Sequence, residues 1–174
     1  MSKTALAVLA FFCLVWCSIP MSAQLIPHGN VYGGVSYGQL TEAVNQQSYR
    51  GWTASAEAIP FARWTYLGFV ADVSGFYRNN EFSRVTQYNF LGGVRLSHSY
   101  QRFRPFIHGL GGIRDVNSSG ITYRPAVVDI GGGADFKLPF KNFSWRLQGD
   151  YMRSHYASAT QNDYRASTGF VWRF

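Results

Sequence analysis

The chain has 174 residues, of which 17% are aromatic and only 14% are charged, and its net charge is +7 at pH 7. Its basic residues stand singly, without the clusters or basic helices typical of nucleic-acid binding, so no nucleic-acid partner is expected. Both cysteines, Cys13 and Cys17, lie close to the N-terminus, so the rest of the chain has no thiol for catalysis or metal binding.

The first 23 residues have the layout of a secretory signal peptide. Lys3 provides a positive charge, residues 5–16 form an apolar run, and the small residue Ala23 suits the position before a cleavage site. A retained membrane helix needs about 20 apolar residues, and Pro20 interrupts this run too early. We therefore expect a signal peptide over residues 1–23 and one domain over residues 24–174.

The rest of the sequence shows a period of two residues and no sustained helical period. Alternation between two kinds of side chain is typical of strands, whose successive residues point to opposite faces. Eight segments have this pattern, at residues 30–38, 51–59, 64–78, 86–97, 103–115, 126–138, 143–156 and 164–174.

In the first four segments one face is apolar, and the opposite face carries Glu57, Asp72 and Arg95. The apolar faces hold Val31, Val35, Tyr37, Trp52, Ala54, Leu67, Phe69, Phe90, Val94 and Leu96. The fifth segment is less regular. Ile107 and Ile113 are expected on its apolar face, and the opposite face then carries Arg104, Phe106, His108, Leu110 and Arg114.

The last three segments alternate clearly again. Their apolar faces hold Val128, Ile130, Phe136, Trp145, Leu147, Tyr151, Phe170, Trp172 and Phe174. Their opposite faces hold Asp129, Asp135, Lys137, Arg146, Asp150, Arg165 and Arg173.

The connections between the segments alternate in length. Short turns are expected at residues 60–63, 100–102 and 139–142, and longer, more polar loops at residues 39–50, 79–85, 116–125 and 157–163. Short turns at one end and long loops at the other are typical of outer-membrane barrels. The sequence therefore predicts an all-β fold: an eight-stranded antiparallel up-and-down transmembrane β-barrel.

In this barrel the apolar faces meet lipid and the polar faces line the interior. The aromatic residues expected to face lipid are Trp52, Phe69, Phe90, Trp145, Phe170 and Trp172. The polar network expected inside consists of Glu57, Asp72, Arg95, Arg114, Asp129, Asp135, Arg146, Asp150, Arg165 and Arg173.

Eight strands enclose a space that side chains just fill, and buried charges must pair. The main expectation is therefore a packed polar interior without a pore. A narrow pore is the alternative, and the basic excess expected inside, including Lys137, would then favour anions. No cofactor is expected, and the widely spaced histidines 28, 98, 108 and 155 show no metal-ligand pattern.

Two rival functions remain open. A soluble, secreted, lipocalin-like barrel would place the aromatic face inside, around a small apolar ligand. A lipid-modifying outer-membrane enzyme would need a nucleophile and a base in contact, and Ser154, His155 and Asp163 are the candidates. Ser154 and His155 are adjacent in a strand and point to opposite faces, which argues against this site.

Three motifs carry a resemblance to a known family: Arg-Pro-Phe-Ile-His at residues 104–108, Asp-Ile-Gly-Gly-Gly-Ala-Asp at residues 129–135, and the final eight residues, 167–174. With these motifs the chain resembles small bacterial outer-membrane β-barrel proteins. It is similar to the transmembrane domain of the outer-membrane protein A and opacity-protein superfamily over residues 24–174.

The resemblance implies a location in the outer membrane of a Gram-negative bacterium, in contact with lipid and lipopolysaccharide. It also implies that the terminal Phe174 is a signal for the outer-membrane assembly machinery. The peptidoglycan-binding domain of longer family members is not found in this sequence, so no cell-wall anchoring is expected. A structural or surface-interaction role follows, in which an extracellular ligand would bind the outer loops.

Overall fold

The computed structural model describes residues 28–41, 46–60, 64–80, 83–118, 121–155 and 160–174. The expected signal peptide lies outside these ranges. Within them, no helix is long and apolar enough to cross a membrane.

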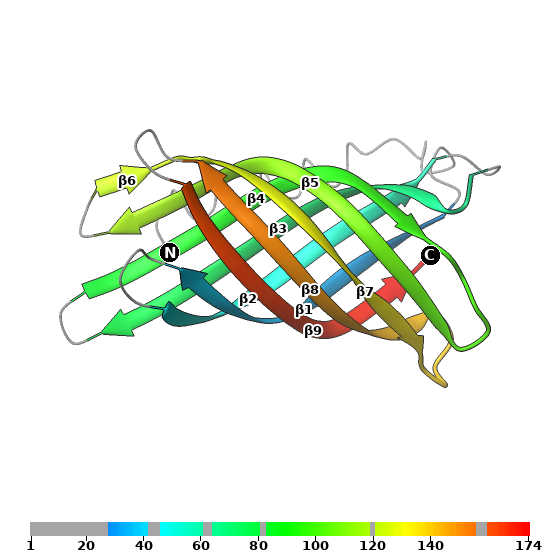
Figure 1. The fold of residues 1–174 in the computed structure, drawn as a ribbon. Helices are drawn as coiled ribbons and strands as arrows, with labels where there is room; N and C mark the ends of the chain where they lie inside the picture. The colour runs from blue at the N-terminus through cyan, green and yellow to red at the C-terminus, as the bar shows by residue number, and fades with distance from the viewer. Residues whose placement is uncertain (1–27, 42–45, 61–63, 81–82, 119–120, 156–159) are drawn as a thin grey trace, which may run out of the picture.

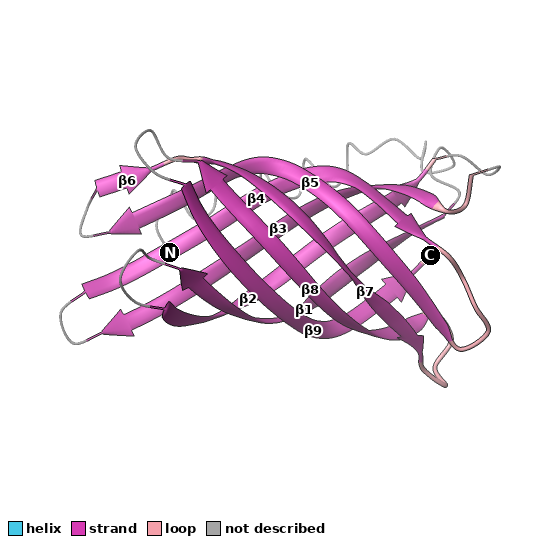
Figure 2. Ribbon diagram, in the orientation of Figure 1, coloured by secondary structure: helices cyan, strands magenta, loops and turns pink. Residues whose placement is uncertain are grey.

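The described part of the chain consists of strands joined by short connections (Figure 2). The strands are β1 (His28–Thr41), β2 (Gln46–Ile59), β3 (Leu67–Asn80), β4 (Ser83–Ser97), β5 (Phe103–Ser118), β6 (Ile121–Tyr123), β7 (Ala126–Lys137), β8 (Phe143–His155) and β9 (Thr160–Arg173).

Eight of these strands close into a barrel. Each pairs antiparallel with the next barrel strand along the chain. The short β6 is not a barrel strand, so β5 pairs directly with β7, and β9 pairs back with β1. Figure 1 shows the last strand beside the first, which completes the ring. The predicted eight-stranded antiparallel up-and-down barrel is confirmed.

The strands extend further at the loop end than the alternation predicts. β1 continues to Thr41 and β2 begins at Gln46, inside the expected loop over residues 39–50, and β6 forms within the expected loop over residues 116–125. At the start of β2 the pattern is inverted, with Tyr49 buried and Arg50 exposed, so the apolar-outside alternation does not mark this end. The backbones of these ends still pair across the ladder.

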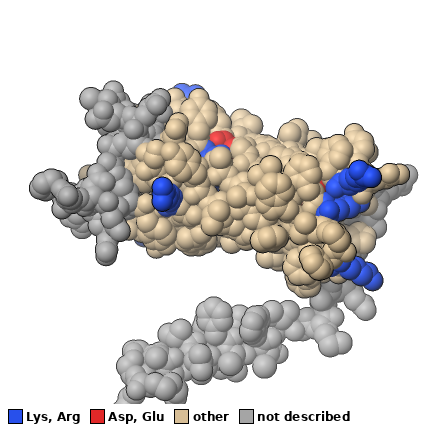
Figure 3. All heavy atoms as spheres, turned by 90° about the horizontal axis from the view of Figure 1, so that it is seen from below, with Lys and Arg blue, Asp and Glu red and all other residues tan. Residues whose placement is uncertain are grey.

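The distribution of side chains is the reverse of that in a soluble protein. Along β8, Phe143, Trp145 and Leu147 are exposed while Ser144 and Arg146 between them are buried. In the face shown in Figure 3, most charged side chains lie toward the two ends, and the region between them is largely uncharged. The aromatic face lies outside, so the lipocalin-like alternative is wrong.

Two glycines allow close contact between neighbouring strands. A Cβ atom on Gly112 of β5 would lie 2.0 Å from the carbonyl oxygen of Phe90 in β4, and one on Gly93 of β4 would lie 2.1 Å from the carbonyl oxygen of Gly109. Side chains at these two positions would force β4 and β5 apart, so the tight coiling of the wall here requires glycine.

Candidate functional site

The candidate site is the interior of the barrel. Nine of the ten residues expected there are buried, and Arg173, at the short-turn end, is half-buried. Alternation along the strands places them inside, and the barrel geometry brings together side chains far apart in the sequence.

Arg165 of β9 is the hub of the interior. Its guanidinium group reaches Asp150 at 2.6 Å, Asp72 at 3.0 Å and Asp129 at 3.1 Å. These carboxylates come from β8, β3 and β7, so one side chain joins four strands across the barrel. The five N–H donors of arginine suit it to bind several carboxylates at once.

Three further ion pairs lie toward the short-turn end. Arg146 binds Asp135 through two hydrogen bonds of 2.6 and 3.0 Å, and Arg173 reaches the same carboxylate at 2.5 Å. Arg95 donates to Glu57 at 3.1 Å. In each pair an arginine neutralises an acid that would otherwise be a costly buried charge.

An aromatic ring separates two of these arginines. Phe106 packs between Arg95 and Arg146, whose guanidinium carbons lie 4.5 and 4.7 Å from its ring centre. Tyr32 covers Arg146 from another side, at 4.8 Å. The stacking holds two like charges apart while giving each a favourable cation–π contact.

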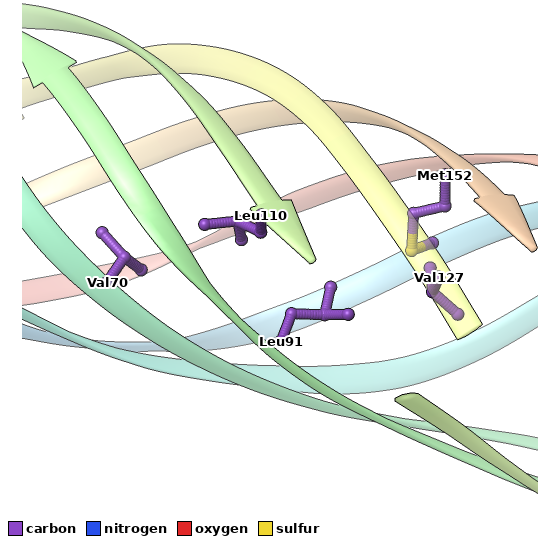
Figure 4. Close-up of a cluster of buried hydrophobic side chains, with 5 residues drawn as sticks. All are labelled: Val70, Leu91, Leu110, Val127 and Met152. Atoms are coloured by element: carbon purple, nitrogen blue, oxygen red, sulfur yellow. The ribbon is translucent and has the colours of Figure 1, made fainter. Parts of the chain in front are cut away.

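The interior also contains an apolar layer. Val70, Leu91, Leu110, Val127 and Met152 are each at most 4% exposed and form one cluster inside the wall (Figure 4). The alternating pattern does not single out this layer, because these residues occupy polar-face positions in the sequence. The polar network continues past this layer, because Ser74 accepts hydrogen bonds from both Arg165 and Asn89.

Nearer the loop end, Arg114 makes two polar contacts in the interior. It forms an ion pair with Asp163 and donates a 2.8 Å hydrogen bond to Asn89. Asp163 was expected in a loop, as a candidate enzyme residue. Instead it is 1% exposed and belongs to β9.

Two expectations about charge are corrected. Lys137 shares the inward face of β7 but lies at the end of that strand. Its side chain is exposed and its amino group donates to the carbonyl oxygen of Tyr100 at 3.0 Å. The expected basic excess inside is also wrong. Among the described residues six acids and four arginines are buried, and the inward Arg104 and Arg173 are half-buried, so the charges balance. The acids are Glu57, Asp72, Asp129, Asp135, Asp150 and Asp163, and the arginines are Arg95, Arg114, Arg146 and Arg165.

The candidate enzyme residues do not converge. Ser154 is buried inside the barrel, His155 is exposed on the outside, and Asp163 pairs with Arg114. The imidazole of His155 lies 3.4 Å from the hydroxyl of Thr160. A base that faces away from the hydroxyl cannot activate it.

The outer surface carries all six aromatic residues expected to face lipid. Their exposure ranges from 38% for Trp52 and Trp145 to 61% for Phe170. Phe174 is 52% exposed, and its backbone exchanges two 3.2 Å hydrogen bonds with Gly29. The terminal residue thereby extends the ladder that closes β9 against β1.

Comparisons with known proteins support the fold. No protein-family model and no curated protein matches the sequence. Among solved structures the chain is similar to Neisserial surface protein A, with 10% identity, a TM-score of 0.70, and 84% of this chain and 97% of that chain covered.

Two further solved structures are similar. One is Ail, the attachment invasion locus protein of Yersinia pestis, with 14% identity, a TM-score of 0.58, and 84% of this chain and 98% of that chain covered. The other is the N-terminal β-barrel domain of Pseudomonas aeruginosa OprF, with 10% identity, a TM-score of 0.54, and 82% and 97% covered. The chain therefore has the fold of the small eight-stranded outer-membrane β-barrels.

Proposed function

We propose that this protein is a non-conducting, non-enzymatic barrel of the bacterial outer membrane that serves a structural or surface-interaction role. The observation that carries the proposal is the arrangement of ion pairs across the interior. Arg165 on β9 reaches Asp72 on β3, and Arg114 on β5 reaches Asp163 on β9. With the apolar cluster, these contacts fill the space that water and ions would need.

Recording in a planar lipid bilayer tests this proposal. The refolded full-length barrel should give a flat current baseline at potentials where an open porin, used as a positive control, conducts. Stepwise currents that scale with the amount of protein would contradict a filled interior and favour the narrow pore.

The chain's contacts with the membrane belong to the same proposal. The outward aromatic residues would contact lipid, and the loop end would contact lipopolysaccharide. The assembly machinery would recognise Phe174 during insertion. The exposed ladder position of Phe174 supports the last of these roles.

A second candidate function is the binding of an anionic ligand at the loop end. Arg50 and Arg153 are exposed there, and so is Arg124, which reaches Asp115 at 3.2 Å. Ail, one of the similar structures, was solved in complex with the heparin analogue sucrose octasulfate. Exposed arginines attract sulfate groups through charge and bidentate hydrogen bonds.

Titration with sucrose octasulfate, in detergent free of lipopolysaccharide, tests this candidate. The double variant Arg50→Gln/Arg153→Gln should weaken binding at least tenfold, and added salt should weaken wild-type binding. Lys141→Gln, an exposed change in a short turn at the other end, is the control and should bind like wild type. Equal binding by all three proteins would remove this function.

A further inference from the structure

Three potential metal ligands surround one glycine inside the barrel. Gly131 of β7 lies opposite His108 of β5 on one side and opposite Asp150 of β8 on the other. Asp129 lies two residues before Gly131, on the same inward face. The Nε2 atom of His108 is 3.1 Å from Oδ1 of Asp150 and 3.8 Å from Oδ1 of Asp129.

The facing atoms of this cluster lack hydrogen bonds. Within the described part of the chain, neither ring nitrogen of His108 makes one, and neither does Oδ1 of Asp129 or Oδ1 of Asp150. All three side chains are 0% exposed. The second oxygen of each carboxylate is bound to Arg165. The contacts of His108 with the two carboxylates are ion pairs only when the imidazole is protonated. With a neutral imidazole the three facing atoms are buried without hydrogen bonds, which is costly, and a bound cation would satisfy all three.

The charge of the cluster points to a divalent cation. Asp72, Asp129 and Asp150 share the single positive charge of Arg165, so the cluster has a net charge of −2 when His108 is neutral. Each of the other fully buried carboxylates has an arginine of its own. An ion of charge +2 would make this cluster neutral.

The glycine leaves room for the ion. A Cβ atom on Gly131 would lie 2.1 Å from Oδ1 of Asp150 and 2.8 Å from Nε2 of His108. The potential ligand atoms therefore point into the space that any other residue at position 131 would occupy. Because the three residues come from three different strands, their spacing in the sequence does not reveal the site.

We propose that His108, Asp129 and Asp150 bind one divalent transition-metal ion of the Zn²⁺ type, through Nε2 and the two Oδ1 atoms. One imidazole and two carboxylates form a ligand set that zinc accepts, at bond lengths of about 2.0–2.2 Å. The mixed nitrogen and oxygen set favours Zn²⁺, Co²⁺ or Ni²⁺ over Mg²⁺. Arg165 holds the other carboxylate oxygens and so orients two of the ligands. The ion would cross-link β5, β7 and β8 from inside.

Refolding with metal tests this site, because in the non-conducting barrel proposed above the ion would have no path to the site once the barrel is closed. The full-length chain is refolded in detergent with Zn²⁺, Co²⁺ or Mg²⁺, excess ion is removed, and bound metal is measured by mass spectrometry. We expect about one Zn²⁺ or Co²⁺ per barrel, no retained Mg²⁺, and for Co²⁺ a visible absorption band that differs from that of the hydrated ion.

Variants then assign the ligands. His108→Gln and Asp150→Asn should each lose at least nine-tenths of the bound Zn²⁺, and Gly131→Ala should lose as much while keeping all three ligands. His98→Gln, a change at an exposed histidine, is the matched control and should retain one equivalent.

Two results would overturn the proposal. The first is that the wild-type barrel folds in the presence of Zn²⁺ but retains no Zn²⁺. This result does not depend on whether any variant folds. The other is equal Zn²⁺ retention by the wild type and His108→Gln, which would place the bound ion elsewhere.

Discussion

The guanidinium group of Arg165 contacts carboxylates from three other strands while being only 2% exposed. Taking such charges out of water costs several kcal/mol each, and close pairing with good hydrogen-bond geometry offsets that cost. Ser74 also accepts a 3.0 Å hydrogen bond from this group. Loss of this one side chain would leave three buried acids without their shared partner.

The variant Arg165→Met should therefore destabilise the barrel strongly. Methionine keeps much of the side-chain volume but removes the charge, and breaking a buried ion pair costs about 3–5 kcal/mol. The free energy of unfolding is measured by urea titration of the barrel in lipid vesicles, followed by tryptophan fluorescence. Arg153→Met, an exposed change on β8, is the control and should alter stability by less than about 0.5 kcal/mol. Equal stabilities of the two variants would contradict the stabilising role of Arg165 among its three carboxylates.

The pair Glu57 and Arg95 provides a different test of buried charge. Asn30 also donates to Glu57, at 2.6 Å, so this pair belongs to a small network. Removing one charge leaves the other unpaired, whereas removing both leaves none. Arg95→Met and Glu57→Gln should each destabilise the fold by at least about 2 kcal/mol. The double variant should cost less than the sum, as measured by a double-mutant cycle of urea unfolding. Additive losses would show that the pair is not coupled.

Along β5, neighbouring glycines have different surroundings. A Cβ atom on Gly112 would collide with the backbone of β4, whereas one on Gly111 would meet no heavy atom within 4 Å. The first glycine is required for the approach of two strands, and the second is not. Substitutions at these two glycines therefore separate the effect of steric crowding on stability from that of backbone entropy.

Gly112→Ala should destabilise the barrel by about 1–3 kcal/mol, because the new methyl group forces β4 and β5 apart. Gly111→Ala should be neutral or stabilise by about 0.5–1 kcal/mol, because alanine loses less conformational freedom on folding. Urea unfolding of both variants in the same vesicles checks the difference. Equal stability of the Gly112→Ala and Gly111→Ala barrels would contradict the close approach of β4 and β5 at Gly112.

The pairing of Phe174 with Gly29 extends the seam where β9 meets β1. If this residue also guides insertion, Phe174→Ala should lower the yield of folded barrel in bacterial outer membranes several-fold, while refolding in detergent changes little. Phe140→Ala, an exposed aromatic change in a short turn, is the control and should keep the wild-type yield. An equal fall in detergent refolding would assign the effect to the seam instead of to recognition.

The whole barrel exposes most of its aromatic side chains and buries six acids and four arginines, so its stability should depend on the surrounding lipid. Ile130, near the middle of β7, is 64% exposed, and Phe140, in a short turn, is 71% exposed. In water these two residues would be equivalent surface positions. In a bilayer only the first faces hydrocarbon.

Ile130→Arg should destabilise the barrel in vesicles by about 2–4 kcal/mol, as expected for arginine near the bilayer centre. Phe140→Arg should have little effect, because its side chain lies with the headgroups or in water. Urea unfolding in vesicles of fixed lipid composition checks both values. Equal effects at the two positions would contradict the assignment of the apolar band to lipid.

The sequence was sufficient to predict the number of barrel strands and the faces of those strands. Successive strand residues point to opposite sides, so a face rich in residues such as Phe69 and Ile130 can be read without knowing its neighbours. The length of the strands and the position of the loops then indicate a membrane barrel, in which the apolar face meets lipid and the charged face lines the interior. The strand ends could not be predicted, because the pattern is inverted there: Tyr49 is buried against Phe76, and Arg50 is exposed.

Only the tertiary structure determines which buried groups meet. The pairs of Arg165 with Asp72 and of Arg114 with Asp163 cross the barrel, and their partners depend on strand register and on how the closed sheet brings opposite walls together. The cluster of His108, Asp129 and Asp150 depends in the same way on the register of β5 and β8 against Gly131. Alternation is a local property of one strand, whereas these contacts arise between strands, and for that reason they become visible only in the folded barrel.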